Sequence, residues 1–193
     1  MAAFLARLSD LTHETLYDPL ISGACSFLAK WQNDDGSWFY ARNHKGKWID
    51  GFHTAYVLQS LKIIHHLRPE SAIQDSLRRG LEFYVTNMFT PDGLPKYYAH
   101  STYPIDSQNC AQSVETLAEL SLEFPECLDL AYDAFLASRQ VLFRDFGDIG
   151  YFILRRGRII RNQLYSLRWA QAPMVLAMIS LQLVTDTTHC QVA

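Results

Sequence analysis

The stretch that decides the fold is Asp35-Gly36-Ser37-Trp38-Phe39-Tyr40, a turn followed by a cluster of aromatic residues. It leads through Trp48-Ile49-Asp50 into an apolar run that starts at Ala55. The same order of turn, aromatic loop and apolar run returns at Asp92-Gly93 and, more loosely, at Asp148. The three aspartates are separated by 57 and 56 residues. A fixed period of this length is typical of a stacked array of similar units.

Apolar residues at helical spacing predict six helices. We expect them at about residues 14–31, from Phe52 to just before Pro69, and at 73–85, 110–120, 128–141 and 174–183. The three longest loops between them have about 16 to 20 residues, a length that is usually functional or contains small hairpins. The sequence therefore predicts an all-α fold of packed αα-hairpins, with long aromatic-rich loops on one face and short turns on the other.

The overall composition limits the possible functions. The chain has 193 residues, 49% of them hydrophobic, and a net charge of −3, so a sizeable core is expected and a nucleic-acid partner is not. The longest apolar stretch, residues 172–184, is too short for a membrane span, and no signal segment opens the chain. The scattered cysteines indicate free thiols in a cytoplasmic protein. They are Cys25, Cys110, Cys127 and Cys190.

The segment 23–38 resembles the QW repeat of the squalene cyclase and prenyltransferase α/α toroids. The matching features are the Phe27-Leu28 dipeptide, Gln32, Gly36 and Trp38. Ser22 stands where a basic residue is usual, and a degenerate second copy over residues 79–93 has Met88 in place of the glutamine. In that superfamily the glutamine ties the end of an outer helix to the next loop. The resemblance therefore implies a structural role for Gln32.

The whole chain looks more like a subset of this superfamily found in bacterial polysaccharide-biosynthesis gene clusters. The motifs that carry this resemblance, which covers residues 23–183, are Asp50-Gly51-Phe52-His53-Thr54, Asp92-Gly93-Leu94-Pro95-Lys96 and Arg168-Trp169-Ala170-Gln171. It implies one domain over residues 1–193, built from about three hairpins of roughly 57 residues each, whereas a closed toroid has about six. We therefore expect a partial toroid, such as the C-terminal half of a longer family, completed by a second copy or a partner chain.

Asp50 and Asp106 begin successive units at equivalent positions, so we expect them near the starts of neighbouring helices, beside one cavity. Paired carboxylates in a cleft suit acid and base catalysis on sugars, and a carboxylate at Asp50 is spaced to orient the imidazole of His53. Asp50, His53 and Asp106 are therefore the candidate catalytic residues. The alternative is that both aspartates are helix N-caps and that His53 is a surface or packing residue. At its helix start, where the first two units have Asp50 and Asp106, the third unit has Arg168 and no acidic residue.

Aromatic and polar residues on the loop face suggest a saccharide groove, because aromatic rings stack on sugar faces. The candidate substrate-binding residues are Trp38, Trp48, Lys96, Tyr97, Tyr98, Gln108, Arg168 and Trp169. Any one ring could instead plug the end of a helical array. The acidic motif of squalene cyclases and the zinc ligands of protein prenyltransferases are missing, and no other metal-binding spacing occurs. We therefore expect no metal and no cofactor.

A local basic run interrupts the acidic chain between Tyr151 and Ile160, and it is predicted to form a hairpin that turns at Gly157. The run consists of Arg155, Arg156, Arg158 and Arg161. These side chains could simply be solvated strand tips. The alternative is a clamp for an anionic sugar, a sugar nucleotide or a lipid-linked pyrophosphate, since arginine suits such groups.

The resemblance and the candidate residues together favour a protein that recognises or modifies a saccharide in bacterial surface-polysaccharide biosynthesis. If it is an enzyme, hydrolase, lyase or epimerase chemistry is expected. A non-catalytic scaffold or binding module, or an inactive truncated toroid, is the first alternative, and a protein like the terpenoid cyclases or prenyltransferases is the second. The expected partners are a saccharide or lipid-linked saccharide, and a second copy or another chain that completes the toroid.

Overall fold

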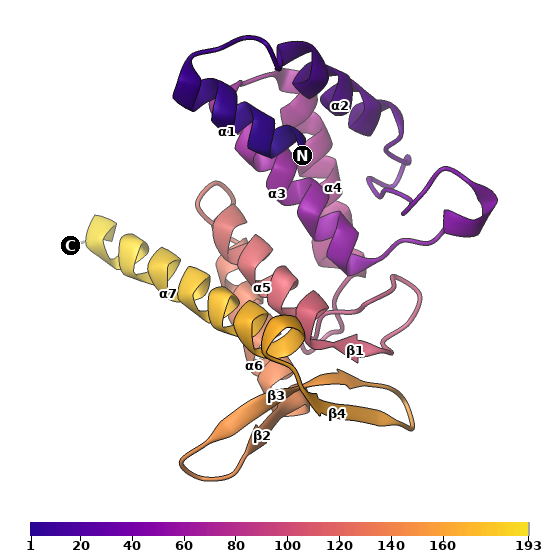
Figure 1. The fold of residues 1–193 in the computed structure, drawn as a ribbon, viewed down its shortest axis with the longest axis vertical. Helices are drawn as coiled ribbons and strands as arrows, with labels where there is room; N and C mark the ends of the chain where they lie inside the picture. Colours follow the sequence, from indigo (N-terminus) through magenta and orange to yellow (C-terminus); the bar gives the residue numbers. More distant parts are fainter. Residues whose placement is uncertain (193) are drawn as a thin grey trace.

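The computed structural model describes residues 1–192, with side chains as far as Thr187. Its α-helices are α1 (Ala2–Thr12), α2 (Asp18–Lys30), α3 (Gly51–Leu67), α4 (Ser71–Asn87), α5 (Ser107–Leu120), α6 (Cys127–Leu142) and α7 (Ala172–Val192). They follow one another as packed pairs, α1 with α2, α3 with α4, and α5 with α6 (Figure 1). The predicted all-α fold of consecutive αα-hairpins is confirmed.

Four helices form a row that we call the inner row. Helix α3 packs against α1 on one side and against α5 on the other, and α5 in turn packs against α7. The remaining helices, α2, α4 and α6, pack behind this row. Helices α3 and α5 begin at the same end of the molecule, beside the long loops (Figure 1). The starts of these inner helices are therefore the place where residues from successive units meet.

The N-terminal helices differ from the sequence prediction. The helix expected at about residues 14–31 begins at Asp18, with Pro19 in its first turn, where proline is tolerated. Helix α1 was not predicted. Its buried residues are Ala3, Ala6 and Ser9, and such small side chains give little of the apolar periodicity on which the prediction depended. It packs against α3 and so extends the inner row by one helix.

The third long loop contains a small sheet. Its strands are β2 (Phe143–Asp145), β3 (Gly150–Arg156) and β4 (Arg161–Tyr165), and β1 (Ile105–Asp106) joins them just before α5. Strand β3 pairs antiparallel with each of the other three. The predicted hairpin is confirmed, since the Gly157 N–H donates to the Ile160 carbonyl at 2.8 Å and closes the turn between β3 and β4.

Gln32 ties three parts of the chain together, as the resemblance implied. Its amide nitrogen donates at 2.9 Å to the carbonyls of Gly36 and Ser76, and its amide oxygen accepts from the Ser76 hydroxyl at 2.8 Å. The Trp38 indole donates to the Leu28 carbonyl at 3.0 Å. The ring is buried against α4, where a Cβ on Gly80 would lie 2.4 Å from it. The end of α2, the aspartate-glycine turn and α4 are thus locked together.

Helix α7 is both a packing helix and an unusually apolar one. Its Met174, Ala177 and Leu181 are buried, on a helix that packs against α5. The stretch Leu167–Thr187 is, within the described residues, the one helical segment long and apolar enough to cross a membrane by length and composition. It is longer than the stretch at 172–184 that the sequence indicated. Its buried residues Met174, Ala177 and Leu181 lie at the spacing of a helix that packs one face against a neighbour.

The cysteines agree with the expectation of free thiols as far as they can be followed. Cys25, Cys110 and Cys127 are buried and form no disulfide. The side chain of Cys190 lies outside the described residues.

Candidate active site at the starts of α3 and α5

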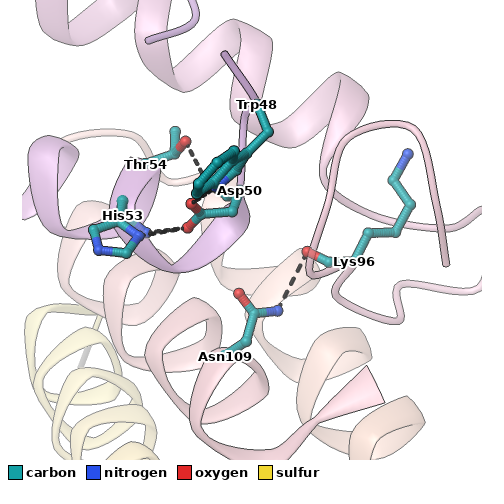
Figure 2. Close-up of polar contacts among 6 residues, drawn as sticks. All are labelled: Trp48, Asp50, His53, Thr54, Lys96 and Asn109. Carbon is teal, nitrogen blue, oxygen red and sulfur yellow. Dashed lines mark hydrogen bonds and ion pairs between the residues drawn. The ribbon is translucent and has the colours of Figure 1, made fainter. Parts of the chain in front are cut away.

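The motif at residues 50–54 builds the first turn of α3. Asp50 is the N-cap, and its Oδ1 accepts the His53 backbone N–H at 2.8 Å. The Thr54 hydroxyl donates to the Asp50 carbonyl at 2.7 Å (Figure 2). Gly51 is required because a Cβ there would lie 2.7 Å from the Lys96 carbonyl oxygen. The motif therefore fixes the cap and lets the second long loop approach it closely.

Asp50 also holds the His53 side chain. The imidazole Nδ1 lies 2.8 Å from Asp50 Oδ1, and the Trp48 indole donates to Asp50 Oδ2 at 3.3 Å (Figure 2). The Asp50 side chain is 2% exposed, whereas that of His53 is 50% exposed. Because Nδ1 faces the carboxylate, Nε2 is the ring nitrogen left for a ligand. A histidine anchored in this way can take up or deliver a proton at a defined position.

Two stacked aromatic rings stand beside this pair. The rings of Tyr40 and Trp48 lie 4.7 Å apart at 14°, and the Tyr40 ring meets the His53 imidazole edge-on at 4.6 Å. Tyr40 is 49% exposed and Trp48 36%. Tyr40 was absent from the candidate residues, although its place in the repeated aromatic loop, two residues after Trp38, was a signal for it.

A cavity of about 680 Å³ opens between α2, α3, the loop that joins them and the start of α1. Phe27 and Leu28 of α2, His53 and Val57 of α3, and Tyr40 are among its lining residues, together with Asp50, Tyr56, Arg42 and Trp38. Two further lining residues contact each other, since the Arg42 guanidinium lies 3.6 Å above the Trp31 ring. Most lining residues are aromatic or apolar, and the Asp50–His53 pair, Arg42 and Lys47 are the acidic and basic side chains among them.

Asp106 occupies the equivalent cap position on α5 but has different partners. Its Oδ1 accepts the backbone N–H groups of Gln108 at 3.1 Å and Asn109 at 3.2 Å. Its Oδ2 accepts from Nε and Nη2 of Arg155, both at 2.7 Å. Arg155 is its cross-strand partner in the β1–β3 pair. Both oxygens of Asp106 are therefore engaged, by the helix cap on one side and by an arginine on the other.

The second long loop connects the two caps. The Gly51 N–H donates to the Tyr97 carbonyl at 2.9 Å, and the Asn109 amide reaches the Lys96 carbonyl at 3.3 Å (Figure 2). Burial raises the pKa of Tyr97, and the carboxylates of Asp106 and Asp50 raise it further. The ring therefore lies within the field of both aspartates. This places Asp50 and Asp106 at the same end of neighbouring helices, as expected from the repeat.

The other candidate residues are spread over the loop face. Trp38 is 7% exposed and belongs mainly to the core. The Lys96 ammonium donates to the Ala99 carbonyl at 2.9 Å. Arg168 and Trp169 lie in η2 (Leu167–Gln171), a π-helical segment before α7, with the guanidinium 4.6 Å above the indole. Neither of these two lines the cavity. The structure thus groups Asp50, His53 and the Tyr40–Trp48 stack, and leaves the rest around them.

A polar network between α3 and α5 was not foreseen. The Gln112 amide donates to Gln59 at 2.8 Å, and Gln59 donates to Glu119 at 3.3 Å. Burial and the neighbouring Glu119 raise the pKa of Glu115, and burial together with Glu115 raises that of Tyr56. Tyr56 also lines the cavity. The sequence did contain a signal for this network, because polar residues recur on one face of helices that are otherwise apolar.

No three histidine, cysteine, aspartate or glutamate side chains gather as metal ligands in the part of the chain that the structure describes.

Comparison with family models and with curated proteins finds no match for this chain. Comparison with solved structures finds an unsaturated glucuronyl hydrolase specific for heparin, at a TM-score of 0.71 and 12% identity, over 96% of this chain and 58% of that one. A cellobiose 2-epimerase from Bacillus thermoamylovorans B4167 is similar at a TM-score of 0.73 and 7% identity, over 96% and 51%. A glycoside hydrolase from family 105 of C. acetobutylicum ATCC 824 is similar at a TM-score of 0.68 and 12% identity, over 94% and 62%.

These similarities concern the fold, since the sequences are almost unrelated. This chain spans between 51% and 62% of the length of those three proteins. Those proteins are therefore longer than the part that this chain matches, which agrees with the expected partial toroid.

Proposed function

We propose that this protein binds a saccharide in the cavity between α2 and α3 and places it against His53. The observation that carries the proposal is the juxtaposition, in the wall of one cavity, of an anchored His53 with the exposed Tyr40 ring, which Trp48 supports from outside the lining by stacking on it. The cavity volume of about 680 Å³ falls in the range of small-molecule sites, which are mostly apolar with a few placed polar groups. The names of the three structural neighbours, all carbohydrate-processing enzymes, support a sugar as the ligand.

The positions of the lining residues suggest a different role for each in binding a sugar. A sugar ring would lie against Tyr40, which shares the cavity wall with Phe27, because the apolar face of a sugar packs on aromatic and aliphatic surface. A sugar hydroxyl would bond to Nε2 of His53, while Arg42 would contact a further polar or acidic substituent. Asp50 would act as a positioning residue, since it is buried and holds Nδ1.

The catalytic form of the proposal assigns proton transfer to His53. Hydrolase, lyase and epimerase reactions all need a group that moves a proton at the sugar, and an oriented imidazole can do so near neutral pH. We assign Asp106 a structural role and not that of a second catalytic acid. Its carboxylate oxygens already accept hydrogen bonds from two backbone N–H groups and from Arg155. Tyr56 also lines the cavity, and its hydroxyl is a second group able to bond to a sugar there.

Binding and turnover can be tested separately. Calorimetric titration with neutral and acidic oligosaccharides should reveal binding, and product analysis of the same sugars should reveal turnover. His53→Gln should lower turnover about a hundred-fold or more, the usual contribution of a general acid or base, while binding survives. Tyr40→Ala should weaken binding about five-fold, since an aromatic contact contributes on the order of 1 kcal/mol.

Matched controls lie elsewhere on the same molecule. His66→Gln changes an exposed histidine at the opposite end of α3, and Tyr132→Ala changes an exposed tyrosine on α6. Neither should alter binding or turnover. Equal losses in the control and site variants would contradict the proposal.

A non-catalytic binding module is the alternative that the cavity equally permits. It predicts sugar binding by the native protein with no product from any sugar, and loss of binding in Tyr40→Ala alone. We do not propose terpenoid chemistry, because all three neighbours act on carbohydrates by their names.

The surface-polysaccharide context stays part of the proposal. It rests on the sequence motifs at residues 50–54, 92–96 and 168–171, and it makes repeat units of bacterial surface polysaccharides, free or lipid-linked, the first ligands to test.

A further inference from the structure

The β3–β4 hairpin carries charge that the cavity does not use. Between Asp148 and Asp186 the sequence has five arginines and no acidic residue. One of them, Arg155, is neutralised by Asp106. Within the described side chains, Arg156, Arg158 and Arg161 form no ion pair. The arginine run therefore divides into one structural residue and a free cationic group at the hairpin tip.

The tip also exposes large apolar side chains. The turn is closed between Gly157 and Ile160, which puts Arg158 and Ile159 at its outermost point. Ile159 is 91% exposed and Ile160 79%. The hairpin extends away from the helices at the edge of the molecule (Figure 1), so no other element covers these residues.

Both features are unfavourable in water. Arg156 and Arg161 are directly opposite each other across the two strands, and like charges in such a position destabilise the pair. Two neighbouring isoleucines at a tip gain nothing from solvent exposure. An apolar phase with an anionic surface would remove both unfavourable effects. Its interior would take up the isoleucine side chains, and its negative charge would neutralise the arginines.

We propose that this hairpin tip docks on the surface of an anionic lipid bilayer. Ile159 and Ile160 enter the boundary between headgroups and acyl chains, and Arg156, Arg158 and Arg161 bond to lipid phosphates. A nucleic acid would also attract the arginines, but its phosphate backbone offers no site for two aliphatic side chains. A second copy of the hairpin would bring arginines against arginines.

The test is cosedimentation with vesicles of phosphatidylcholine alone and of phosphatidylcholine mixed equally with phosphatidylglycerol. The native protein should bind the mixed vesicles and not the neutral ones. Arg158→Gln and Arg161→Gln should each weaken binding about five-fold, which corresponds to the contribution of one basic residue near an anionic surface. The double change Ile159→Ser with Ile160→Ser should abolish binding at physiological salt.

The control is Ile149→Ser. This isoleucine is 74% exposed at the other end of β3, next to Asp148, and its loss should leave vesicle binding unchanged. A second, positive readout is tryptophan fluorescence: Ile159→Trp should give a blue shift with the mixed vesicles, and Ile149→Trp should not.

Several results would overturn the proposal. They are equal binding to both kinds of vesicle, no binding to either, an equal loss in the Ile149 control, or displacement from vesicles by a short oligonucleotide at low concentration. The tip variants leave the α2–α3 cavity unchanged, so sugar binding in them should equal that of the native protein. Failure of the docking proposal is therefore distinct from failure of the saccharide proposal.

Discussion

Two aspartates cap neighbouring inner helices, yet their surroundings give them different chemistry. Asp50 holds a half-exposed imidazole, whereas Asp106 holds an arginine. The repeat predicts their equivalent positions, and the N-cap alternative predicts their backbone contacts. The arginine partner was beyond sequence reasoning, because the pairing of β1 with β3 brings together residues 49 positions apart and no local pattern fixes that register.

The structural role of Asp106 leads to a prediction. Asp106→Asn keeps a cap oxygen and loses an ion pair to a half-exposed arginine, so it should cost less than about 1 kcal/mol of unfolding free energy. Asp106→Ala should cost about 1–2 kcal/mol because the cap is lost too. Urea denaturation measures both. If Asp106→Asn instead abolished turnover of a sugar while stability held, Asp106 would be a reacting acid after all.

Glu115 gives a prediction about pH. Burial and Glu119 raise its folded-state pKa above the ordinary 4.5. The folded state therefore binds this proton more tightly, and the resulting stabilisation is fully present below pH 4.5 and is lost as pH rises through the folded pKa. Glu115→Gln, which stays neutral, should be more stable than the native protein at neutral pH. Denaturation curves should show this advantage disappear in acid, and the exposed Glu82→Gln should show none.

At the scale of elements, the turn glycines of the first two units contact a helix, whereas the corresponding glycine of the third unit does not. Gly36 and Gly93 have positive φ, and each turn sits on the outer helix of the following unit. A Cβ on Gly36 would lie 2.2 Å from the Arg79 carbonyl oxygen, and one on Gly93 would lie 2.7 Å from Asp133 Cβ. Gly147 has the same positive φ but nothing within 4 Å.

These turns provide an internally controlled prediction. Gly36→Ala should cost about 3 kcal/mol or more, because strain at positive φ adds to a clash with the backbone of α4. Gly147→Ala should cost only the strain, about 1–2 kcal/mol. Thermal or urea unfolding of the two variants checks this. Equal costs would mean that the turn-to-helix contact contributes little.

Elements with strong patterns were predictable and elements set by packing were not. The five central and C-terminal helices follow apolar periodicity, and the hairpin follows its turn glycine. Helix α1 was not predicted because its buried residues are alanine and serine. The short strands β1 and β2 were not predicted because they form only by pairing with β3. The cavity could not be predicted from the sequence, because its position and shape depend on how α2, α3 and the loop between them pack in three dimensions.

At the scale of the whole molecule, α7 leaves an open edge. Leu176 and Ile179 are each 50% exposed, whereas Leu117 and Leu120, at the equivalent positions 59 residues earlier, are fully buried. The difference arises because α5 has α6 behind it and α7 beside it. Large contiguous apolar patches are rare on monomers. We therefore expect this edge to be covered by a second copy or a partner chain.

Light scattering tests the expectation. The purified chain should show a mass above its 22.1 kDa, and Leu176→Gln with Ile179→Gln should shift it towards the monomer. Leu136→Gln, an exposed leucine on α6, should have no effect. A stable monomer that is indifferent to all these changes would argue against an interface at α7.

The central claim is that a sugar binds against His53 in the cavity between α2 and α3. The most direct measurement is a crystal structure of the protein soaked with an oligosaccharide repeat unit. It should show a sugar ring on Tyr40, with a hydroxyl within hydrogen-bond distance of His53 Nε2 and the Asp50–Nδ1 contact intact. A sugar bound only elsewhere, such as on the face of η2 beside Arg168 and Trp169, with this cavity empty, would contradict it.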